Sequence, residues 1–508
     1  MAPTNNQPGA APGSWRLAPD IAAATQGLIA SPFSDLPEGE ALFLTLPEGS
    51  RGAWLNTLRA AITITPATGP TRPDPSAAIA FTASGLKVMG LDDTVERTFS
   101  IEFREGMHQF DRRRRLGDDD PKAVIANGPI WSGNIEDPIA PPEHRSPGTP
   151  VTVHAALLLY AIDGDSLANV VRTATSALHQ AGVVIAHRLP LLLRPDPDGG
   201  TPREHFGFAD GISQPVPFGD AIQTPGGAPY PKDPWHGVPA GDILMGQLDS
   251  HQQVAPGPLV IKKKCDADVI LPTAGAPTGF YNLGRNGSYL VIRELRQDVA
   301  AFWKNMDREA ATLDQPGIDA NWVAERVVGR RLDGTPLLPA SALPSDPNAA
   351  KTFNAFGFFG PDQFGRSCPF GSHMRRSNPR DGLGRTSADG ADLLKSVNSH
   401  RILRRGRKYG ETIADRRVDD GKDRGLLFMC LNTDIARQFE FTQQTWLVNP
   451  GFASLHGETD PLLGPAGPFT IPAEPFRYRP NVETYIHFAG GEYFFLPSLP
   501  ALNYLGSL

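Results

Sequence analysis

Short apolar runs are the clearest pattern in this chain, and they indicate buried β-strands. The strands predicted in this way span residues 41–46, 78–81, 98–101, 151–160, 183–188, 286–293 and 425–431. Over residues 51–62, Trp54, Leu55, Leu58 and Ile62 recur at helical spacing, which predicts an amphipathic helix. Further helices are predicted over residues 165–182, 298–307 and 433–442.

The order of these elements predicts the fold class. In the first part of the chain a strand and a helix precede three strands, a second helix and a last strand, which is typical of an antiparallel sheet of the split βαβ kind. The second half repeats this order around a loop-rich insert between Pro336 and Gly410. We therefore predict an α+β protein with a flexible arm over residues 1–20, a first domain over 21–200 and a second over 201–508.

Composition and charge narrow the functional class. The 508 residues are 40% hydrophobic and 20% charged, which is ordinary for a globular protein. A net charge of −7 gives no broad attraction to nucleic acid or to an anionic membrane. The three cysteines form no C-x-x-C pair, so neither a disulfide framework nor a zinc module is expected. Since no signal peptide is visible, a cytoplasmic enzyme is expected, or a secreted one if a precursor segment has been removed.

The segment Cys368–Arg380 sets one imidazole, His373, ahead of the guanidiniums of Arg375, Arg376 and Arg380. Imidazole is a common ligand for transition metals, and haem iron is often held by a single proximal His. Haem also carries two propionates, which arginine binds bidentately. The segment therefore favours an iron porphyrin over a bare zinc ion, although on its own such a sequence is more often a solvated surface loop.

Two further segments carry polar groups that suit a cofactor site. Two glycines bracket Asp210 in the segment 206–215, and glycine lets backbone approach a ligand closely, so this carboxylate can face a flat cofactor. An ordinary Asp-Gly turn would look the same. In the segment 399–406, two apolar residues precede Arg404, which predicts a strand that carries a guanidinium into the interior, where it needs an anionic partner. A basic surface patch is the alternative.

Other side chains are alternative candidates for ligands or sites. Cys368 could supply an axial thiolate to iron, and His400 could supply a second imidazole. The charged runs 112–115 and 118–120 are typical of a solvated loop. No nucleophile elbow, P-loop or EF-hand motif occurs in the sequence.

Taken together, five segments resemble the motifs of the dye-decolorizing peroxidases, in the order in which that family has them. They are Gly207-Phe-Ala-Asp210-Gly211, the Cys368–Arg380 segment, Arg401-Ile-Leu-Arg404-Arg-Gly406, Gly425-Leu-Leu-Phe428 and Gly490-Gly-Glu-Tyr-Phe-Phe495. Ordered motifs spread over most of the chain are far more specific than any single one. The length of the chain and its His373 segment resemble the longer, fungal-like and advanced members.

The resemblance implies two ferredoxin-like domains with antiparallel sheets packed together and one haem b per chain, held mainly by the second domain. His373 would be the proximal iron ligand, and Asp434 is the expected carboxylate partner of its other ring nitrogen. Either Arg375 or Arg380 would meet a propionate, and the sequence does not choose between them.

On the other side of the haem, the resemblance places Asp210 and Arg404. Asp210, or a water that it holds, would move a proton between the two peroxide oxygens, while Arg404 supplies positive charge where the O–O bond breaks. Leu426 and Phe428 would wall this pocket and keep it narrow. The resulting ferryl intermediate would take single electrons from dyes or phenolic donors.

The expected partners are therefore hydrogen peroxide and small-molecule electron donors, with neither nucleic acid nor membrane, and a homo-oligomer is left open. The main rival is a haem-binding or haem-handling protein with incidental peroxidase activity. It would share His373 but would not need both Asp210 and Arg404. A third possibility is a non-haem α+β dimer module with arginines on its surface.

Overall fold

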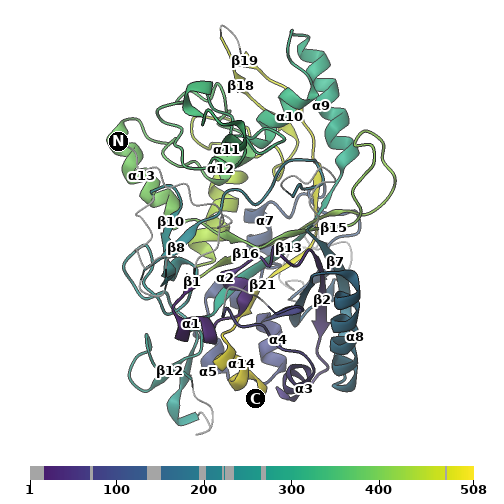
Figure 1. Cartoon of the computed structure of the whole chain (residues 1–508), viewed down its shortest axis with the longest axis vertical. Coiled ribbons are helices and arrows are strands. Elements are labelled where there is room, and N and C mark those ends of the chain that lie inside the picture. The colour runs from purple at the N-terminus through teal and green to yellow at the C-terminus, as the bar shows by residue number, and fades with distance from the viewer. Residues whose placement is uncertain are drawn as a thin grey trace.

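The computed structural model describes residues 16–68, 73–133, 150–193, 202–219, 222–223, 234–264, 271–474 and 477–508. Its centre is a closed ring of strands in the order β13-β16-β15-β7-β2-β6-β3-β21, which closes because β21 also pairs with β13 (Figure 1). The ring strands are β2 (Glu38–Thr45), β3 (Ser76–Phe81), β6 (Ala155–Ala161), β7 (Val184–Leu192), β13 (Ser288–Gln297), β15 (Arg407–Tyr409), β16 (Gly425–Asn432) and β21 (Ile486–Leu496).

The first half of the chain supplies one antiparallel sheet in the order β7-β2-β6-β3. Successive strand residues point to opposite faces, so Leu42 and Leu44 of β2 pack in the core under the helices, whereas Phe43 points into the ring. The covering helices are α3 (Ala53–Ala61) and α8 (Gly164–Gln180), both amphipathic as predicted. This is the β-α-β-β-α-β order of a ferredoxin-like unit.

The second half repeats that topology with the sheet order β15-β16-β13-β21. Its first helix, α9 (Val299–Leu313), follows β13, and a π-helical stretch over Ala436–Glu440 and Thr442–Leu447 follows β16. The two sheets join at their edges, where Lys408 of β15 pairs with Leu192 of β7 and Phe495 of β21 pairs with Phe81 of β3. The predicted duplication of one α+β unit thus has a structural counterpart, and the edge pairing turns two sheets into one ring.

The predicted insert between residues 336 and 410 contains helices that the sequence left unassigned. It holds α11 (Pro347–Thr352), α12 (His373–Ser377) and α13 (Ser387–Ser399). Just before it, α10 (Ala320–Val328) packs against α9 in a core of its own that also contains Phe206 and Tyr485. Figure 1 shows α9, α10 and the insert in the upper part of the molecule, above the ring.

Several further elements surround these layers. Further helices are α1 (Pro19–Ala24), α2 (Gly27–Ala30), α4 (Ala83–Val88), α5 (Asp93–Glu96), α6 (Ile101–Glu105), α7 (Phe110–Leu116) and α14 (Leu499–Gly506). Short strands include β4 (Trp131–Ser132), β5 (Val151–Thr152), β8 (Val216–Phe218), β10 (Gly237–Pro239), β11 (Leu259–Ile261), β12 (Phe280–Asn282), β17 (Gly467–Pro468), β18 (Ile471–Pro472), β19 (Arg477–Tyr478) and β20 (Asn481–Val482).

Two sequence predictions about local structure are wrong. The strand predicted over 98–101 is absent, because Ser100 caps helix α6 and its Oγ accepts the Phe103 N–H at 3.4 Å. The charged run 112–115 lies in helix α7 and is not a solvated loop, since Arg112 is buried and its Nε donates to Glu440 Oε1 at 2.5 Å. The partner lies more than three hundred residues further along the chain, so no local pattern predicts this burial.

Part of the predicted arm and the predicted boundary between the two domains lie outside the described residues. These are residues 1–15 of the arm and the boundary at 200/201. Arg16–Leu17 form β1, which pairs with β9 (Ile222–Gln223), so the end of the predicted arm pairs with a strand of the predicted second domain.

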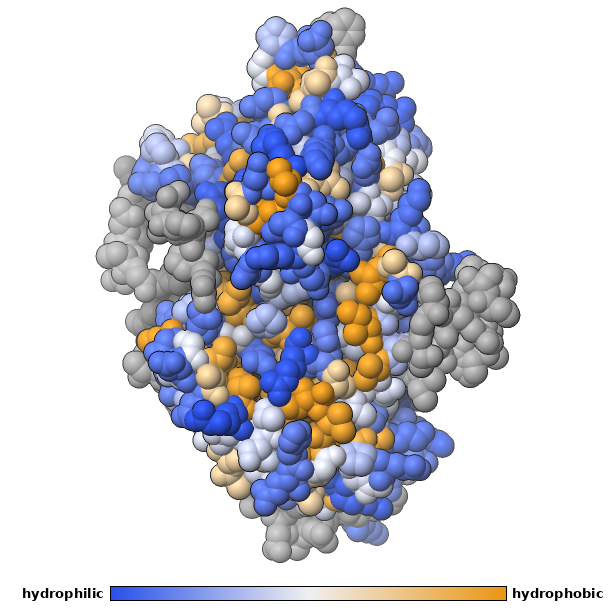
Figure 2. Space-filling view, turned by 90° about the vertical axis from the view of Figure 1, so that its right-hand side faces the viewer, coloured by the Kyte–Doolittle hydropathy of each residue, from blue (hydrophilic) through white to orange (hydrophobic). Residues whose placement is uncertain are grey.

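The surface is predominantly hydrophilic on the face drawn in Figure 2, with hydrophobic residues in patches across its middle and lower part. Scattered apolar residues of this kind are normal on a folded protein. Among the helices of the described residues, none combines the length and the apolar character needed to cross a membrane.

Candidate functional site

The outer face of β16 forms one wall of the candidate site. Leu427, Met429 and Leu431 point into the ring core, so Leu426 and Phe428 face outward, where both are only half-buried. On the neighbouring strand β14 (Leu403–Arg404), Arg404 pairs with Cys430 of β16. Residues directly opposite each other in a sheet share a face, so the Arg404 side chain lies on the same face of the sheet as Phe428 and Leu426. The structure therefore places these three predicted residues on one face.

Asp210 meets Arg404 over this face. Arg404 Nη1 lies 3.2 Å from Asp210 Oδ1, and Nη2 donates to the Ser213 carbonyl at 3.3 Å. The two side chains are 33% and 40% exposed, so the pair contributes little to the stability of the fold. What the geometry provides instead is an acid and a guanidinium, side by side, that a ligand can reach.

The glycines around Asp210 are required by the backbone. Gly207 has a φ of +98° and Gly211 a φ of +79°, both in the region that L-residues rarely adopt. A Cβ on Gly207 would also lie 2.4 Å from the Arg416 Cζ atom. The pattern therefore marks a tightly packed loop that aims Asp210 at Arg404, rather than a simple surface turn.

His373 is the first residue of α12 and is oriented by a buried carboxylate. Its Nδ1 lies 3.0 Å from Asp460 Oδ2, and the other Asp460 oxygen accepts the N–H groups of Leu462 and Leu463 at 2.9 Å each. Burial lowers the pKa of His373, but the fully buried Asp460 outweighs it, so the pKa lies above its ordinary value. With Nδ1 engaged, Nε2 is the ring nitrogen that can bind a metal.

The predicted partner of His373 was wrong. Asp434 instead caps its own turn, accepting the Arg437 N–H at 2.9 Å, and its Oδ2 lies 3.4 Å from Arg437 Nε. Asp460 lies 87 residues beyond His373, in the sequence Glu-Thr-Asp-Pro, where an aspartate that caps a turn is the expected interpretation. Asp460 does cap this turn through Oδ1, and its Oδ2 is the atom that contacts His373.

The charges of Asp210 and Arg404 act on His373. Beyond Asp460, the Arg404 guanidinium lowers the pKa of His373 and the Asp210 carboxylate raises it. The side chain of His373 is 30% exposed, comparable to Asp210 and Arg404, whereas Asp460 behind it is completely buried. His373 and the Asp210–Arg404 pair are therefore near enough to interact electrostatically.

The arginines that follow His373 are bound by the protein. Arg375 is 1% exposed, and its Nη1 donates to Asp362 Oδ2 at 3.0 Å and to the Cys368 carbonyl at 2.7 Å. Arg380 donates from Nη1 to the carbonyls of Asn354 and Phe356, at 2.8 Å each. These bonds hold the insert together around His373, and the contact of either arginine with a propionate stays a prediction.

Two alternative iron ligands fit their surroundings poorly. Burial raises the pKa of Cys368 to about 11, which keeps the side chain as a thiol rather than the thiolate that binds iron. His400 donates from Nδ1 to the Arg437 carbonyl at 2.5 Å and stacks on Phe441 with ring centroids 3.8 Å apart. Among the three candidates, His373 is the one with a supporting carboxylate and an open side.

These groups form a donor set that fits a haem. A single imidazole backed by a carboxylate suits an axial iron ligand, and an acid–guanidinium pair beside apolar Leu426 and Phe428 suits the opposite side. Over 376 residues the chain is 32% identical to the multifunctional dye peroxidase DyP2 of Amycolatopsis sp., a match that covers 70% of this chain and 71% of that protein. The chain belongs to the dye-decolorizing peroxidases.

Other similarities agree with this assignment. The peroxidase is 28% identical over 467 residues to the dye-decolorizing peroxidase msp1 of the fungus Mycetinis scorodonius, covering 85% of this chain and 77% of that one. The solved DyP-type peroxidase of Anabaena sp. superposes with a TM-score of 0.69 at 26% identity, covering 96% of this chain and 95% of that one. No family model matches the sequence.

The family assignment confirms the fold and activity that the sequence predicted. The peroxidase has the α+β fold with two ferredoxin-like units, and it is an oxidoreductase that acts on hydrogen peroxide. Dye-decolorizing peroxidases are haem enzymes, so haem is its cofactor and small molecules are its substrates.

Proposed function

We propose that the cofactor is haem b, whose iron His373 Nε2 would bind. The observation that carries this proposal is the His373–Asp460 pair at 3.0 Å, because the fully buried carboxylate fixes the ring and leaves one nitrogen for the metal. When bound, the haem iron supplies the site for peroxide and the redox chemistry of O–O cleavage.

The protein contribution to peroxide activation comes from Asp210 and Arg404. Asp210 Oδ1 already accepts the Gly211 N–H at 2.6 Å and the Arg404 guanidinium at 3.2 Å. Oδ2 is then the atom that takes a proton from hydrogen peroxide and returns it to the departing oxygen. Arg404 places a fixed positive charge where negative charge develops during cleavage.

Leu426 and Phe428 define which molecules approach. Their apolar side chains, both half-buried, narrow the space beside Arg404. Hydrogen peroxide reaches the haem there, whereas a bulky dye gives up its electron from outside this space. One solved relative carries 2,6-dimethoxyphenol, and we propose methoxyphenols of this kind, together with dyes, as electron donors of this peroxidase.

The proposal is tested on protein loaded with one haem per chain. The pyridine haemochrome spectrum should match haem b, and 2,6-dimethoxyphenol should be oxidised only when hydrogen peroxide is present. A haemochrome of another haem type would contradict the cofactor assignment. Loaded protein that binds haem but shows no peroxide-dependent oxidation would favour the rival haem-handling function. A homo-oligomer and a cytoplasmic location stay predictions.

A further inference from the structure

The carboxylate of Glu204 lies inside the loop that carries Asp210. Its Oε2 accepts the Phe206 N–H at 2.8 Å, and its Oε1 accepts the Phe208 N–H at 2.9 Å. Phe206 and Phe208 are 2% and 3% exposed, so their N–H groups are buried with them. Buried backbone donors need acceptors, and the Glu204 side chain supplies two of them at once.

The rest of this loop is held by backbone bonds. Gly207 N donates to the Glu204 carbonyl at 2.9 Å, Ala209 N to the Leu332 carbonyl at 3.1 Å, and Asp210 N to the Pro202 carbonyl at 3.1 Å. The backbone N–H groups of this loop are therefore paired, and those of Phe206 and Phe208 donate to Glu204. Its carboxylate sets the loop conformation from which the Asp210 side chain leaves.

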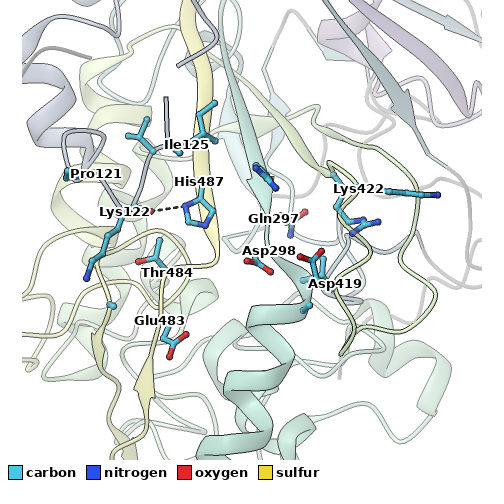
Figure 3. Close-up of a pocket in the computed structure, with 17 residues that line it drawn as sticks. Pro121, Lys122, Ile125, Gln297, Asp298, Asp419, Lys422, Glu483, Thr484 and His487 are labelled. Atoms are coloured by element: carbon cyan, nitrogen blue, oxygen red, sulfur yellow. Dashed lines mark hydrogen bonds between the residues drawn. The ribbon is translucent and has the colours of Figure 1, made fainter. Parts of the chain in front are cut away.

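Gln297, the last residue of β13, fixes Glu204 from behind. Its Nε2 donates to Glu204 Oε2 at 2.8 Å, which also determines the orientation of the Gln297 amide, since an oxygen in that place would face another oxygen. Gln297 is 6% exposed and lines a pocket of about 560 Å³ between the start of α9 and the loop around Asp419 (Figure 3). A chain of hydrogen bonds thus links β13, at the edge of this pocket, to the Asp210 loop.

The electrostatic surroundings of the half-buried Glu204 are unusual for an acid. Three neutral N–H donors hold the carboxylate, while the neighbouring Arg203 guanidinium is directed to the Gly207 and Leu332 carbonyls, at 2.9 and 2.6 Å. Burial raises the pKa of Glu204, and the negative charge of Asp210 adds to that rise. Keeping a carboxylate in such a place is costly, and hydrogen bonding to the loop is what retains it.

We propose that Glu204 is a positioning residue of this peroxidase, which acts through the backbone of residues 206–210 to hold Asp210 against Arg404. The inference rests on the proposed role of Asp210 in peroxide activation. Glu204 itself lies behind the loop and does not touch the peroxide. Its effect is expected on the peroxide step and not on the affinity for the electron donor.

The test is the isosteric substitution Glu204→Gln. The new amide keeps the size of the side chain but replaces one acceptor oxygen with an N–H donor, which must then face another donor. In haem-loaded protein, the second-order rate constant for hydrogen peroxide should fall at least about tenfold, with the KM for 2,6-dimethoxyphenol unchanged. In haem-free protein, the amides of residues 206–210 should exchange hydrogen faster, a readout that does not depend on activity.

Glu492 provides a control, because it is a second glutamate that accepts backbone N–H groups. It is 1% exposed and accepts Met107 N at 2.6 Å and Tyr493 N at 2.8 Å, away from the Asp210 loop. Glu492→Gln should lower the melting temperature without slowing the peroxide step. The inference is overturned if Glu204→Gln reacts with peroxide at the wild-type rate, or if Glu492→Gln slows that step equally. An Asp210→Asn variant that reacts normally overturns the proposed function itself, which separates the two failures.

Discussion

The two ferredoxin-like units have the same topology, but their corresponding strands face different surroundings. In the first unit, β6 is buried along its whole length, with α3 and α8 packed in the same core as its outer face. In the second unit, the equivalent strand β16 alternates between buried residues and the half-buried Leu426 and Phe428. There α9 joins α10 in a separate core, so the helix layer does not seal the sheet. One duplicated fold thus supplies both a closed core and a site.

A second contrast lies within the site. The His373–Asp460 pair has a completely buried carboxylate, whereas both members of the Asp210–Arg404 pair are more than 30% exposed. The first arrangement fixes a ligand, and the second leaves charged groups within reach of a substrate. Under the proposed roles, cofactor retention and peroxide activation depend on different side chains, so substitutions should separate the two.

The largest effect on the peroxide step is expected for Asp210→Asn. The amide cannot take a proton, so the rate constant for hydrogen peroxide should fall by about 10²–10⁴-fold while haem is retained. Stopped-flow absorption after peroxide addition measures this rate. A variant that reacts within twofold of wild type would show that the exposed pair does not perform the proton transfer.

A somewhat smaller loss is expected for Arg404→Leu, about 10²-fold in the same rate constant, because the fixed positive charge is removed. The control is Arg417→Leu, an arginine that is half-exposed and paired with Asp307. That variant should react with peroxide normally. Equal loss in both variants would indicate a general effect of charge and not a role specific to Arg404.

The sequence predicted much of the framework and one side of the site. Apolar runs predicted the ring strands, because buried strands have a strong local signature. Asp210 and Arg404 were predicted because each lies in a local motif, between glycines or after an apolar pair. Leu426 and Phe428 were expected from the resemblance to the family. These features depend on short-range pattern, which the sequence contains directly.

The rest depended on contacts between distant segments. Asp460 reaches His373 across 87 residues, and Glu204 reaches Gln297 across 93, without a local signal for either. Arg375 donates to Asp362 and to the Cys368 carbonyl, two protein partners that the sequence did not predict. Ring closure likewise requires edge pairing that the order of elements does not reveal. A local sequence pattern does not reveal hydrogen bonds between residues that are far apart in the chain.

Asp460→Asn tests the His373–Asp460 pair, the one with the buried carboxylate. Without the carboxylate the imidazole loses its fixed orientation, and haem affinity should fall about 10–100-fold. Transfer of haem to an excess of apomyoglobin measures this loss. Asp434→Asn, the partner that the sequence suggested, should release haem at the wild-type rate. If Asp434→Asn loses haem faster than Asp460→Asn, the assignment from the structure is wrong.

Leu157→Ala probes the closed core of the first unit, where Leu157 is fully buried on β6. The cavity should cost about 2–5 kcal/mol in free energy of unfolding, measured by denaturant titration. The peroxide rate of the folded, haem-loaded variant should be unchanged, the smallest effect in this series. A reduced rate at full haem content would show that the two units are not functionally separate.

The most direct test of the account is the absorption spectrum of His373→Ala after loading with haem, compared with His400→Ala and Cys368→Ala. The account predicts that His373→Ala alone loses the wild-type Soret band and most of its bound haem. A His373→Ala protein with the wild-type Soret band and haem content would contradict the central claim that this imidazole holds the iron.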